Sequence, residues 1–423
     1  MIEGTEQATP EQAKPTGAAN RIGSLDFIRG LAVMGILAAN IVAFGQPFGA
    51  YMWPEAFLTP HGESSDWMWV AQFVLVDGKM RGLFTLLFGA GLYLFMEKAW
   101  ERGASRWLQV RRLAWLLVFG AIHFFFIWRG DILVFYAIAG FVAVLCLRWK
   151  AKTQFVVGIL GYLVGALFLM ASIGLGYFVT ETSFGEREGM AEVREGFDAG
   201  KAAAVADDAA ETEILTDGSY ADFVAHNFSE HASDPLAGFV LFGFETLPLM
   251  LMGMALYRWG LFSGGLRAGR QRLWGWIGVA VGTALTIPIA LWAKDTGFTY
   301  WGNTSAFMAF SHLPRLPVVL GLAALLALWG SQANGWLARR VSAAGRAAFT
   351  NYLGTSVVMI LVFHPWAGGL WGDLTRPGLY VIVVLAWVLM LAWSQPWLKR
   401  FRFGPLEWLW RCLTYWRLFP LRR

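Results

Sequence analysis

The sequence is poor in charge and in cysteine. Only 15% of its 423 residues are Asp, Glu, Lys or Arg, whereas soluble proteins carry about 25%. The two cysteines, Cys146 and Cys412, are too few for a disulfide-rich secreted scaffold. Because 57% of the residues are hydrophobic and 16% are aromatic, a water-soluble globule, a disordered chain and a collagen-like fibre are also excluded.

Long apolar runs dominate what is present. Ten segments are long enough to cross about 30 Å of hydrocarbon at about 1.5 Å per residue. The sequence therefore predicts an all-α polytopic membrane protein with about ten transmembrane helices. These segments are 25–46, 70–96, 111–128, 131–147, 154–178, 236–257, 273–293, 314–331, 345–364 and 378–397. The second segment is interrupted at 77–81, which indicates a break or a re-entrant stretch.

The basic residues indicate an orientation for these spans. Lys and Arg cluster in every second loop, at 97–112, 148–152, 258–272 and 331–346, and in the tail from 399. By the positive-inside rule both termini are cytoplasmic. The predicted parts are a disordered tail (1–22), two five-helix halves (23–178 and 236–398), an acidic extracytoplasmic helical loop between them (179–235), and a basic tail (399–423).

The outer loop at 179–235 is unusually acidic, with 14 acidic and three basic residues. Residues 191–215 are rich in Ala and Glu and favour a helix. One interpretation is a solvated helical flap that its charge keeps soluble. The other is a lid over a site that faces outward. The sequence leaves both open.

Charged residues at membrane depth are costly, so each is a functional candidate. Asp26 and Arg29 lie three apart at the cytoplasmic end of the first span and can pair. They form either an interfacial cap or an anion site for the phosphates of a donor. Asn40 lies about three turns further along. Lys79 and Arg81, beside Asp77, form either a structural ion cluster or a functional site.

The sharpest cluster lies at the turn between the third and fourth spans. His123 is close to the outer end of one apolar helix, and Asp131 begins the next after Gly130. The turn can bring Asp131 to His123, and a carboxylate on one imidazole nitrogen raises the basicity of the other. The alternative is a hydrogen-bonded core histidine with Asp131 as a helix cap.

Other polar positions carry weaker signals. The remaining candidates at membrane depth are Tyr136, Glu245, Arg346, Asn351 and Glu407. His226, His231 and Asp234 have loose spacing without a tight ligand pattern, so we expect no metal. The chain contains no Gly-rich nucleotide-binding loop, and we expect no nucleic-acid partner.

Several motifs together resemble a known family. They are LDFIRG at 25–30 with Asn40, Lys79 with LLFGAG at 86–91, His123 and Trp128 with GDIL at 130–133 and Tyr136, Gly345 with Arg346, TNYL at 350–353, and GPLEWLWR at 404–411. This set resembles the YeiB-like bacterial inner-membrane proteins, a domain-of-unknown-function family. The resemblance covers nearly the whole chain and implies a multi-pass protein of the bacterial inner (plasma) membrane.

The first span is also similar to that of a wider transmembrane acyltransferase group, which includes the acyltransferase-3 enzymes and heparan glucosaminide acetyltransferase. This similarity implies a cytoplasmic acyl-CoA or acetyl-CoA donor and a glycan-like or small-molecule acceptor on the far side. Acyltransferase-3 enzymes have a catalytic histidine where this chain has Asn40. The heparan enzyme type has Asn there and takes its histidine from the next outer loop, where this chain has His61.

Two hypotheses of function follow. In the first, Asp26, Arg29 and Lys79 hold the donor. His123, oriented by Asp131, is the general base, and Asn40 stabilises an oxyanion. In the second, the intramembrane polar residues line the path of a transporter or channel-like protein. The expected partners are the lipid bilayer, the acceptor and, as a homo-oligomer, further copies of the chain.

Overall fold

The computed structural model describes residues 22–60 and 62–423, and the regular elements of this part of the chain are helices. The α-helices are α1 (Gly23–Gly45), α2 (Glu63–Leu75), α3 (Lys79–Trp100), α4 (Trp107–Phe126), α5 (Leu133–Leu145), α6 (Ala151–Leu169), α7 (Leu175–Glu181), α8 (Ala191–Asp217), α9 (Tyr220–Ser229), α10 (Asp234–Arg258), α11 (Ala268–Asp295), α12 (Tyr300–Ser305), α13 (His312–Gln332), α14 (Trp336–Arg346), α15 (Ala348–Phe363), α16 (Arg376–Arg400) and α17 (Pro405–Tyr415). The predicted all-α fold class is confirmed.

The long apolar helices make this a polytopic membrane protein. Eight helical segments of the described chain are long and apolar enough to cross a bilayer, and α14 with α15 makes a ninth when this bent pair is one span. The eight segments are Gly23–Gly45, Glu63–Trp100, Trp107–Phe126, Ala151–Glu181, Asp234–Arg258, Ala268–Asp295, His312–Gln332 and Arg376–Arg400. Each of the ten predicted segments falls on a helix. The predicted segment 131–147 is neither one of the eight spans nor the bent pair, and it corresponds to α5, a shorter apolar helix of 13 residues.

The predicted break in the second span is present. Gly78 has a φ of 68° and separates α2 from α3. This left-handed conformation suits glycine, which has no Cβ. A side chain at Gly78 would also meet the guanidinium of Arg315. The break therefore brings a charged residue of α13 against the backbone between α2 and α3.

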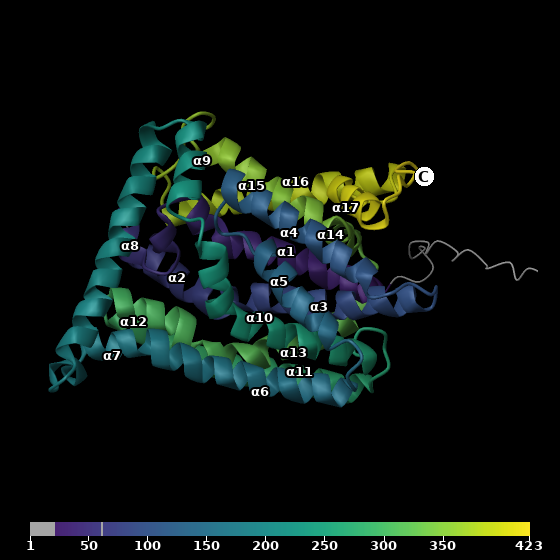
Figure 1. Ribbon diagram of the computed structural model, residues 1–423, viewed down its shortest axis with the longest axis horizontal. Helices are drawn as coiled ribbons and strands as arrows, with labels where there is room; N and C mark the ends of the chain where they lie inside the picture. Colours follow the sequence, from purple (N-terminus) through teal and green to yellow (C-terminus); the bar gives the residue numbers. More distant parts are fainter. Residues whose placement is uncertain (1–21, 61) are drawn as a thin grey trace, which may run out of the picture.

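The two ends of the helix bundle differ. The acidic helix α8 lies across one end and the C-terminus lies at the opposite end (Figure 1). The start of α1 lies beside the basic loop 258–272, because Ser24 Oγ donates to the Phe262 carbonyl over 2.7 Å. The end of α1 lies beside α8, because Gly49 N donates to Asp208. We call the basic end inner and the acidic end outer, as the positive-inside rule predicts.

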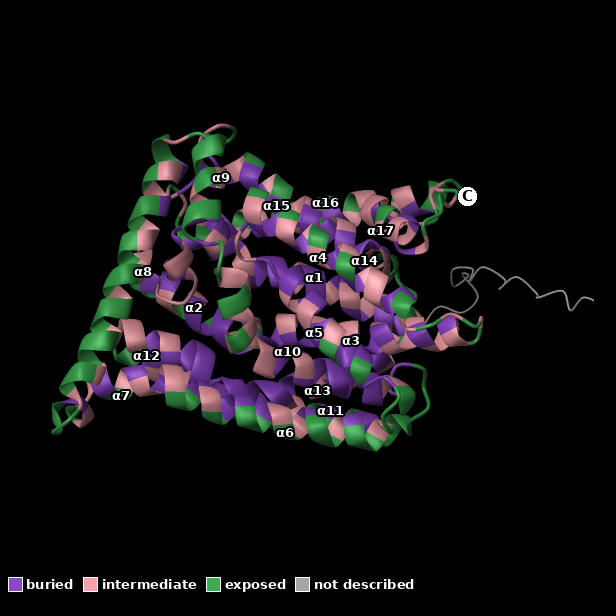
Figure 2. Cartoon of the chain, in the orientation of Figure 1, coloured by how far each residue is buried: buried purple, intermediate pink, exposed green. Residues whose placement is uncertain are grey.

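Burial separates core helices from lipid-facing ones. In α1, 61% of the most apolar window is buried, whereas the value is 22% in α11 and 28% in α6 and α16. Figure 2 shows the same contrast between the mostly buried α1 and the partly exposed α6. Exposed Leu and Val residues such as Leu167 and Leu285 fit a hydrocarbon environment.

Close packing fixes α14 against the start of α1. A Cβ on Gly345 would meet the backbone oxygen of Asp26, and one on Gly30 would meet that of Val341. Small residues at such crossings let membrane helices approach closely. This contact places Arg346, at the end of α14, in the same region as Asp26 and Arg29.

Candidate active site

The structure brings His123 and Asp131 together across the α4–α5 turn. His123 Nδ1 lies 2.8 Å from Asp131 Oδ1, and neither side chain is exposed. The second carboxylate oxygen, Oδ2, accepts a hydrogen bond of 2.7 Å from Val134 N at the start of α5. Asp131 therefore contacts both the imidazole of His123 and the backbone at the start of α5.

The other imidazole nitrogen of His123 is unusual. Nε2 is buried and has no hydrogen-bond partner among the described residues. Aromatic rings surround it, with ring centroids at 5.2 Å for Tyr352 and 6.3 Å for Trp128. Most buried polar atoms are hydrogen-bonded, so each exception calls for an explanation. When Nδ1–H donates to Asp131, Nε2 is left as a bare acceptor, as a general base requires.

An outer cavity of about 480 Å³ lies beside this pair. Its walls are mainly apolar, with eight polar or charged side chains among them. They are Asn40, Tyr51, Arg81, Arg129, Asp131, Tyr136, Asp234 and Thr246. His123 is not among the described residues that line it, so the pair meets this cavity through Asp131 and Trp128. His61, the alternative reactive histidine, lies outside the described residues.

An inner cavity of about 320 Å³ opens among residues of the basic end. It is rich in guanidinium groups and carries two carboxylates. The charged lining residues are Asp26, Arg29, Arg112, Arg346, Glu407 and Arg411. Arg29 Nη1 lies 3.2 Å from Asp26 Oδ1, as their spacing predicts. A site with this composition suits a phosphate-bearing ligand, because guanidinium groups bind phosphate oxygens in pairs.

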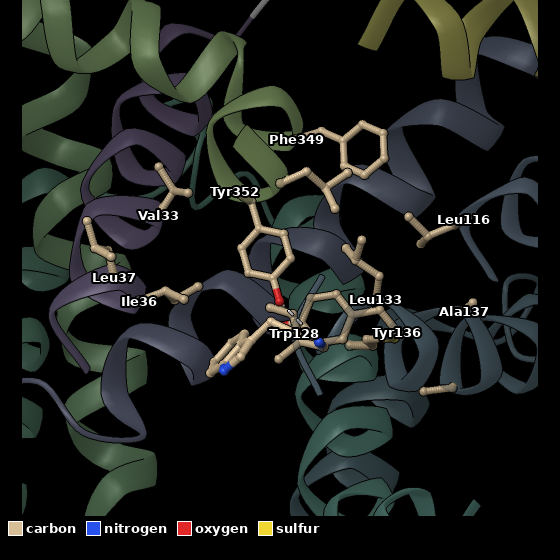
Figure 3. Packing of buried hydrophobic residues seen from close by; sticks show 14 of the residues in the cluster. Val33, Ile36, Leu37, Leu116, Trp128, Leu133, Tyr136, Ala137, Phe349 and Tyr352 are labelled. Carbon is tan, nitrogen blue, oxygen red and sulfur yellow. Dashed lines mark hydrogen bonds between the residues drawn. The ribbon is translucent and has the colours of Figure 1, made fainter. Parts of the chain in front are cut away.

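The two cavities share one wall. Tyr136 lines both, with Leu133 on the inner side and Ile132 on the outer side. The Tyr136 hydroxyl lies 2.6 Å from Thr85 Oγ1, which ties α5 to α3. Figure 3 shows Tyr136 and Leu133 beside Trp128, with the hydroxyl of Tyr352 directed toward them. The inner and outer cavities are thus separated by the first turn of α5.

Lys79 lies apart from Asp26 and Arg29, with which it was expected to form the donor site. Its Nζ donates to the Phe73 carbonyl over 2.5 Å, and the side chain is buried. Arg29 lies against Gly91, which is 12 residues further along α3 and therefore about 18 Å away. Lys79 does not line the inner cavity in the described chain. Its place near the α2–α3 break separates it from Asp26 and Arg29.

Arg81 belongs to a charge cluster that links three helices. Glu245 Oε2 lies 2.8 Å from Arg81 Nη2 and 2.9 Å from Arg315 Nη1. Arg315 also donates to the Phe307 carbonyl over 2.9 Å. The sequence indicated Glu245 and Arg81 separately, but their contact and the role of Arg315 depend on how α3, α10 and α13 pack. Because Arg81 lines the outer cavity, this cluster also sets the charge of its wall.

Asn351 and Glu407 hold the bend of 84° between α14 and α15. Asn351 Nδ2 donates to the Ala344 carbonyl over 2.9 Å, and its Oδ1 accepts from the Trp393 indole. Glu407 accepts from Phe349 N over 2.8 Å at the start of α15, where the backbone N–H groups have no partner within the helix. Both residues therefore stabilise local backbone, and Glu407 also lines the inner cavity.

The outer loop is docked through Arg129. Its Nη1 lies 3.0 Å from Asp207 Oδ2 and its Nη2 lies 2.7 Å from Glu211 Oε2, both on α8. Burial acts to raise the pKa of Asp207, but hydrogen bonds from His231 and Arg129 outweigh it and lower this pKa to about 2. Burial raises the pKa of Asp208 to about 6. Arg129 lines the outer cavity, so α8 is tied to its rim.

These features define a helical membrane protein with a buried His–Asp pair beside a mainly apolar outer cavity, which Tyr136 separates from an arginine-rich inner cavity. The chain belongs to the YeiB-like family. Residues 256–417 match the family described as "Protein of unknown function (DUF418)". The chain is 31% identical to the uncharacterized protein YeiB of Escherichia coli (strain K12), over 92% of this chain and 95% of that relative. It is 30% identical to the uncharacterized protein YxaH of Bacillus subtilis (strain 168), over 95% and 96%.

Proposed function

We propose that the protein is an acyltransferase of the bacterial inner membrane. It would move an acyl group from a cytoplasmic acyl-CoA, such as acetyl-CoA, to a glycan-like or small-molecule acceptor on the outer side. The observation that carries this proposal is the pair of cavities that meet at Tyr136 beside His123 and Asp131. A reaction between substrates from opposite sides of a membrane needs such a meeting point.

The inner cavity supplies the donor site. Its four arginines face a cavity at the inner end of the bundle, where the donor would arrive. The phosphates of coenzyme A would bind Arg29 and Arg112, and the acyl thioester would extend toward Tyr136. Arg112 is already held in place by stacking on Phe95 and Trp410, at 4.6 Å and 4.2 Å from the ring centroids. A preorganised guanidinium loses less entropy when it binds a phosphate.

The reaction itself needs one base and one oxyanion donor. The acceptor hydroxyl or amine attacks the thioester carbonyl carbon, so a bond to its oxygen or nitrogen forms and the carbon–sulfur bond breaks. His123 Nε2 takes the acceptor proton and returns it to the departing thiolate. Asp131 holds the imidazole in the required tautomer. Asn40, on the wall of the outer cavity, would donate a hydrogen bond to the developing oxyanion.

This mechanism requires Trp128 to move. The indole lies between the outer cavity and His123, and it stacks on Phe44 with ring centroids 4.1 Å apart. Its Nε1 donates to the Ala43 carbonyl over 3.2 Å, so a single weak hydrogen bond and apolar contacts hold it. Acceptor binding would shift Trp128 and open His123 Nε2 to the cavity.

The shared wall also favours a second candidate function, transport. If Tyr136 and Leu133 moved, the two cavities would join into a polar path along the bundle. A transporter would carry its substrate across chemically unchanged. An acyltransferase would release free coenzyme A on the inner side and leave the acyl group on the acceptor.

Inner-membrane vesicles with acetyl-CoA labelled in the acetyl group would distinguish these functions. We expect label in an acceptor of the membrane or the lumen, together with release of free coenzyme A thiol. The variant His123→Ala should lose both signals by about 10²–10⁴-fold, the usual contribution of a general base. Arg339→Gln, an exposed base outside both cavities, is the matched control for general effects.

Two results would overturn the acyltransferase proposal. One is wild-type protein that neither binds nor hydrolyses any acyl-CoA. The other is His123→Ala protein that retains full transfer. Label that crosses the membrane as intact acetyl-CoA would support transport instead.

A further inference from the structure

Three potential metal ligands converge at the outer end of the molecule, next to Arg129 on the rim of the outer cavity. They are Asp207 on α8, His226 on α9 and His231 in the turn before α10, and their ligand atoms lie within 4.8 Å of one another. Asp207 Oδ1 faces both rings, at 3.7 Å from His226 Nε2 and 3.3 Å from His231 Nε2. We propose that these residues bind a divalent transition-metal ion of the zinc class.

The ligand set and its spacing suit such an ion. Zinc prefers imidazole nitrogen and carboxylate oxygen in a tetrahedral arrangement, with bonds of about 2.0–2.2 Å. Ligand atoms around a tetrahedral ion are then about 3.3–3.5 Å apart. Two of the ligand-atom separations are 3.3 Å and 3.7 Å and the third is at most 4.8 Å, so side-chain shifts would bring all three to the tetrahedral spacing. Three protein ligands leave a fourth position for water or for a group on a bound molecule.

The two histidines are prepared for ligation in different ways. His226 Nε2 is buried and has no hydrogen-bond partner among the described residues. His231 Nδ1 lies 2.9 Å from Asp234 Oδ2. A carboxylate on the remote nitrogen is the usual second-shell partner of a metal-binding histidine, because it fixes the tautomer and raises the basicity of the coordinating nitrogen. When the Nδ1 proton lies toward Asp234, Nε2 faces Asp207 with its lone pair, so a bound metal would replace the hydrogen bond between His231 and Asp207.

The charged side chains around the cluster are mostly acidic, which favours a bound cation. Four carboxylates lie at or beside it, from Asp207, Asp208, Glu211 and Asp234. Arg129 faces them, with its Nη1 at 3.0 Å from Asp207 Oδ2 and 3.3 Å from His231 Nε2. When a metal binds His231, Arg129 would give up that second contact and keep its bonds to Asp207 Oδ2 and Glu211. The arginine and the metal would then use different oxygens of the same carboxylate.

The site would join three separate segments. Asp207 comes from α8, His226 from α9, and His231 from the turn that leads into α10. Asp207 and His231 contact Arg129, which lines the outer cavity. A bound ion would therefore fix α8 over the outer end of the bundle. The expectation of no metal rested on the loose spacing of His226, His231 and Asp234, and it did not consider Asp207, which lies 19 residues before His226.

A titration with Zn²⁺ tests the site. It uses the full-length protein in detergent, which is purified without a polyhistidine tag and dialysed against a chelator. We expect one Zn²⁺ per chain by calorimetry, and a visible absorption spectrum of tetrahedral Co²⁺ when cobalt is used. His226→Gln and Asp207→Asn should each weaken Zn²⁺ binding by more than 100-fold. Asp234→Asn, which removes the second-shell partner, should weaken it by about 10–100-fold.

Asp198→Asn is the matched control, since it removes an exposed acid of the same helix that lies outside the cluster. It should bind Zn²⁺ as the wild type does. Wild-type protein that binds no Zn²⁺, or binding that is unchanged in His226→Gln and Asp207→Asn, would overturn the proposal. If either variant fails to fold, the Co²⁺ spectrum of the wild type decides, because an octahedral spectrum contradicts the site.

Discussion

The hydroxyl of Tyr352 accepts a hydrogen bond of 3.2 Å from the backbone N–H of Ile132, 220 residues away in the chain. This bond joins α15 to the turn that carries Asp131. It is buried, and the tyrosine ring also packs 5.2 Å from the His123 ring centroid. The C-terminal half of the chain therefore helps to position the His–Asp pair contributed by the N-terminal half.

The substitution Tyr352→Phe removes this hydrogen bond and leaves the ring in place. The Ile132 N–H then stays buried without its partner, which costs about 1–3 kcal/mol. We expect a lower thermal unfolding midpoint and a larger loss of acyl transfer than of donor binding, since Tyr352 positions the turn. Equal losses in transfer and donor binding would contradict this role.

Glu245→Gln tests the charge cluster between α3, α10 and α13. The change leaves the buried Arg315 and the partly buried Arg81 without their shared carboxylate, which should destabilise the protein by about 3–5 kcal/mol. The free, buried thiols of Cys146 and Cys412 allow unfolding to be followed with a thiol-reactive dye. Glu101→Gln, at an exposed ion pair with Lys98, should change stability by about 1 kcal/mol or less. Similar midpoints for the two variants would refute a structural role for the cluster.

Gly345→Ala tests the close crossing of α14 and α1. The added methyl group would meet the Asp26 carbonyl oxygen and push the helices apart, at a cost of about 1–3 kcal/mol. Gly354→Ala is the control, because a Cβ there meets nothing within 4 Å. The control should be neutral or slightly stabilising, since alanine favours a helix more than glycine does. A stable Gly345→Ala protein would mean that the crossing is loose.

Arg29→Gln tests the donor site in the inner cavity. Loss of one charge-assisted hydrogen bond to phosphate costs about 1.5–3 kcal/mol, so the dissociation constant for acetyl-CoA should rise by about 10–100-fold. Lys79→Gln is the informative comparison, because the structure places Lys79 outside this cavity. It should bind acetyl-CoA like the wild type in any preparation that remains folded. A greater loss in Lys79→Gln than in Arg29→Gln would restore the donor role that the sequence suggested for Lys79.

The parts of the site that the sequence predicted are local in the chain. His123 and Asp131 are eight residues apart across one turn, and Asp26 and Arg29 share one helix face. The break at Gly78 was also predicted, because charged residues interrupt an apolar run. Hydropathy and short-range spacing carry this information directly.

The parts that the sequence did not predict depend on tertiary packing. Glu245 and Arg315 are 70 residues apart, and no periodicity connects them. Asp207 joins His226 and His231 only because α8 folds back over the outer end. Lys79 was grouped with Arg29 because both are charges at membrane depth, but Arg29 of α1 contacts Gly91 of α3, far along that helix from Lys79. A hydropathy pattern shows which helices cross the membrane and leaves open which of their faces meet.

A density map of the protein in a lipid nanodisc with a non-hydrolysable acetyl-CoA analogue tests the central claim most directly. We predict density in the inner cavity, with the phosphates at Arg29 and Arg112 and the acyl end at Tyr136, near His123. Analogue bound in the outer cavity, or an empty inner cavity at saturating concentration, would contradict the proposed acyltransferase.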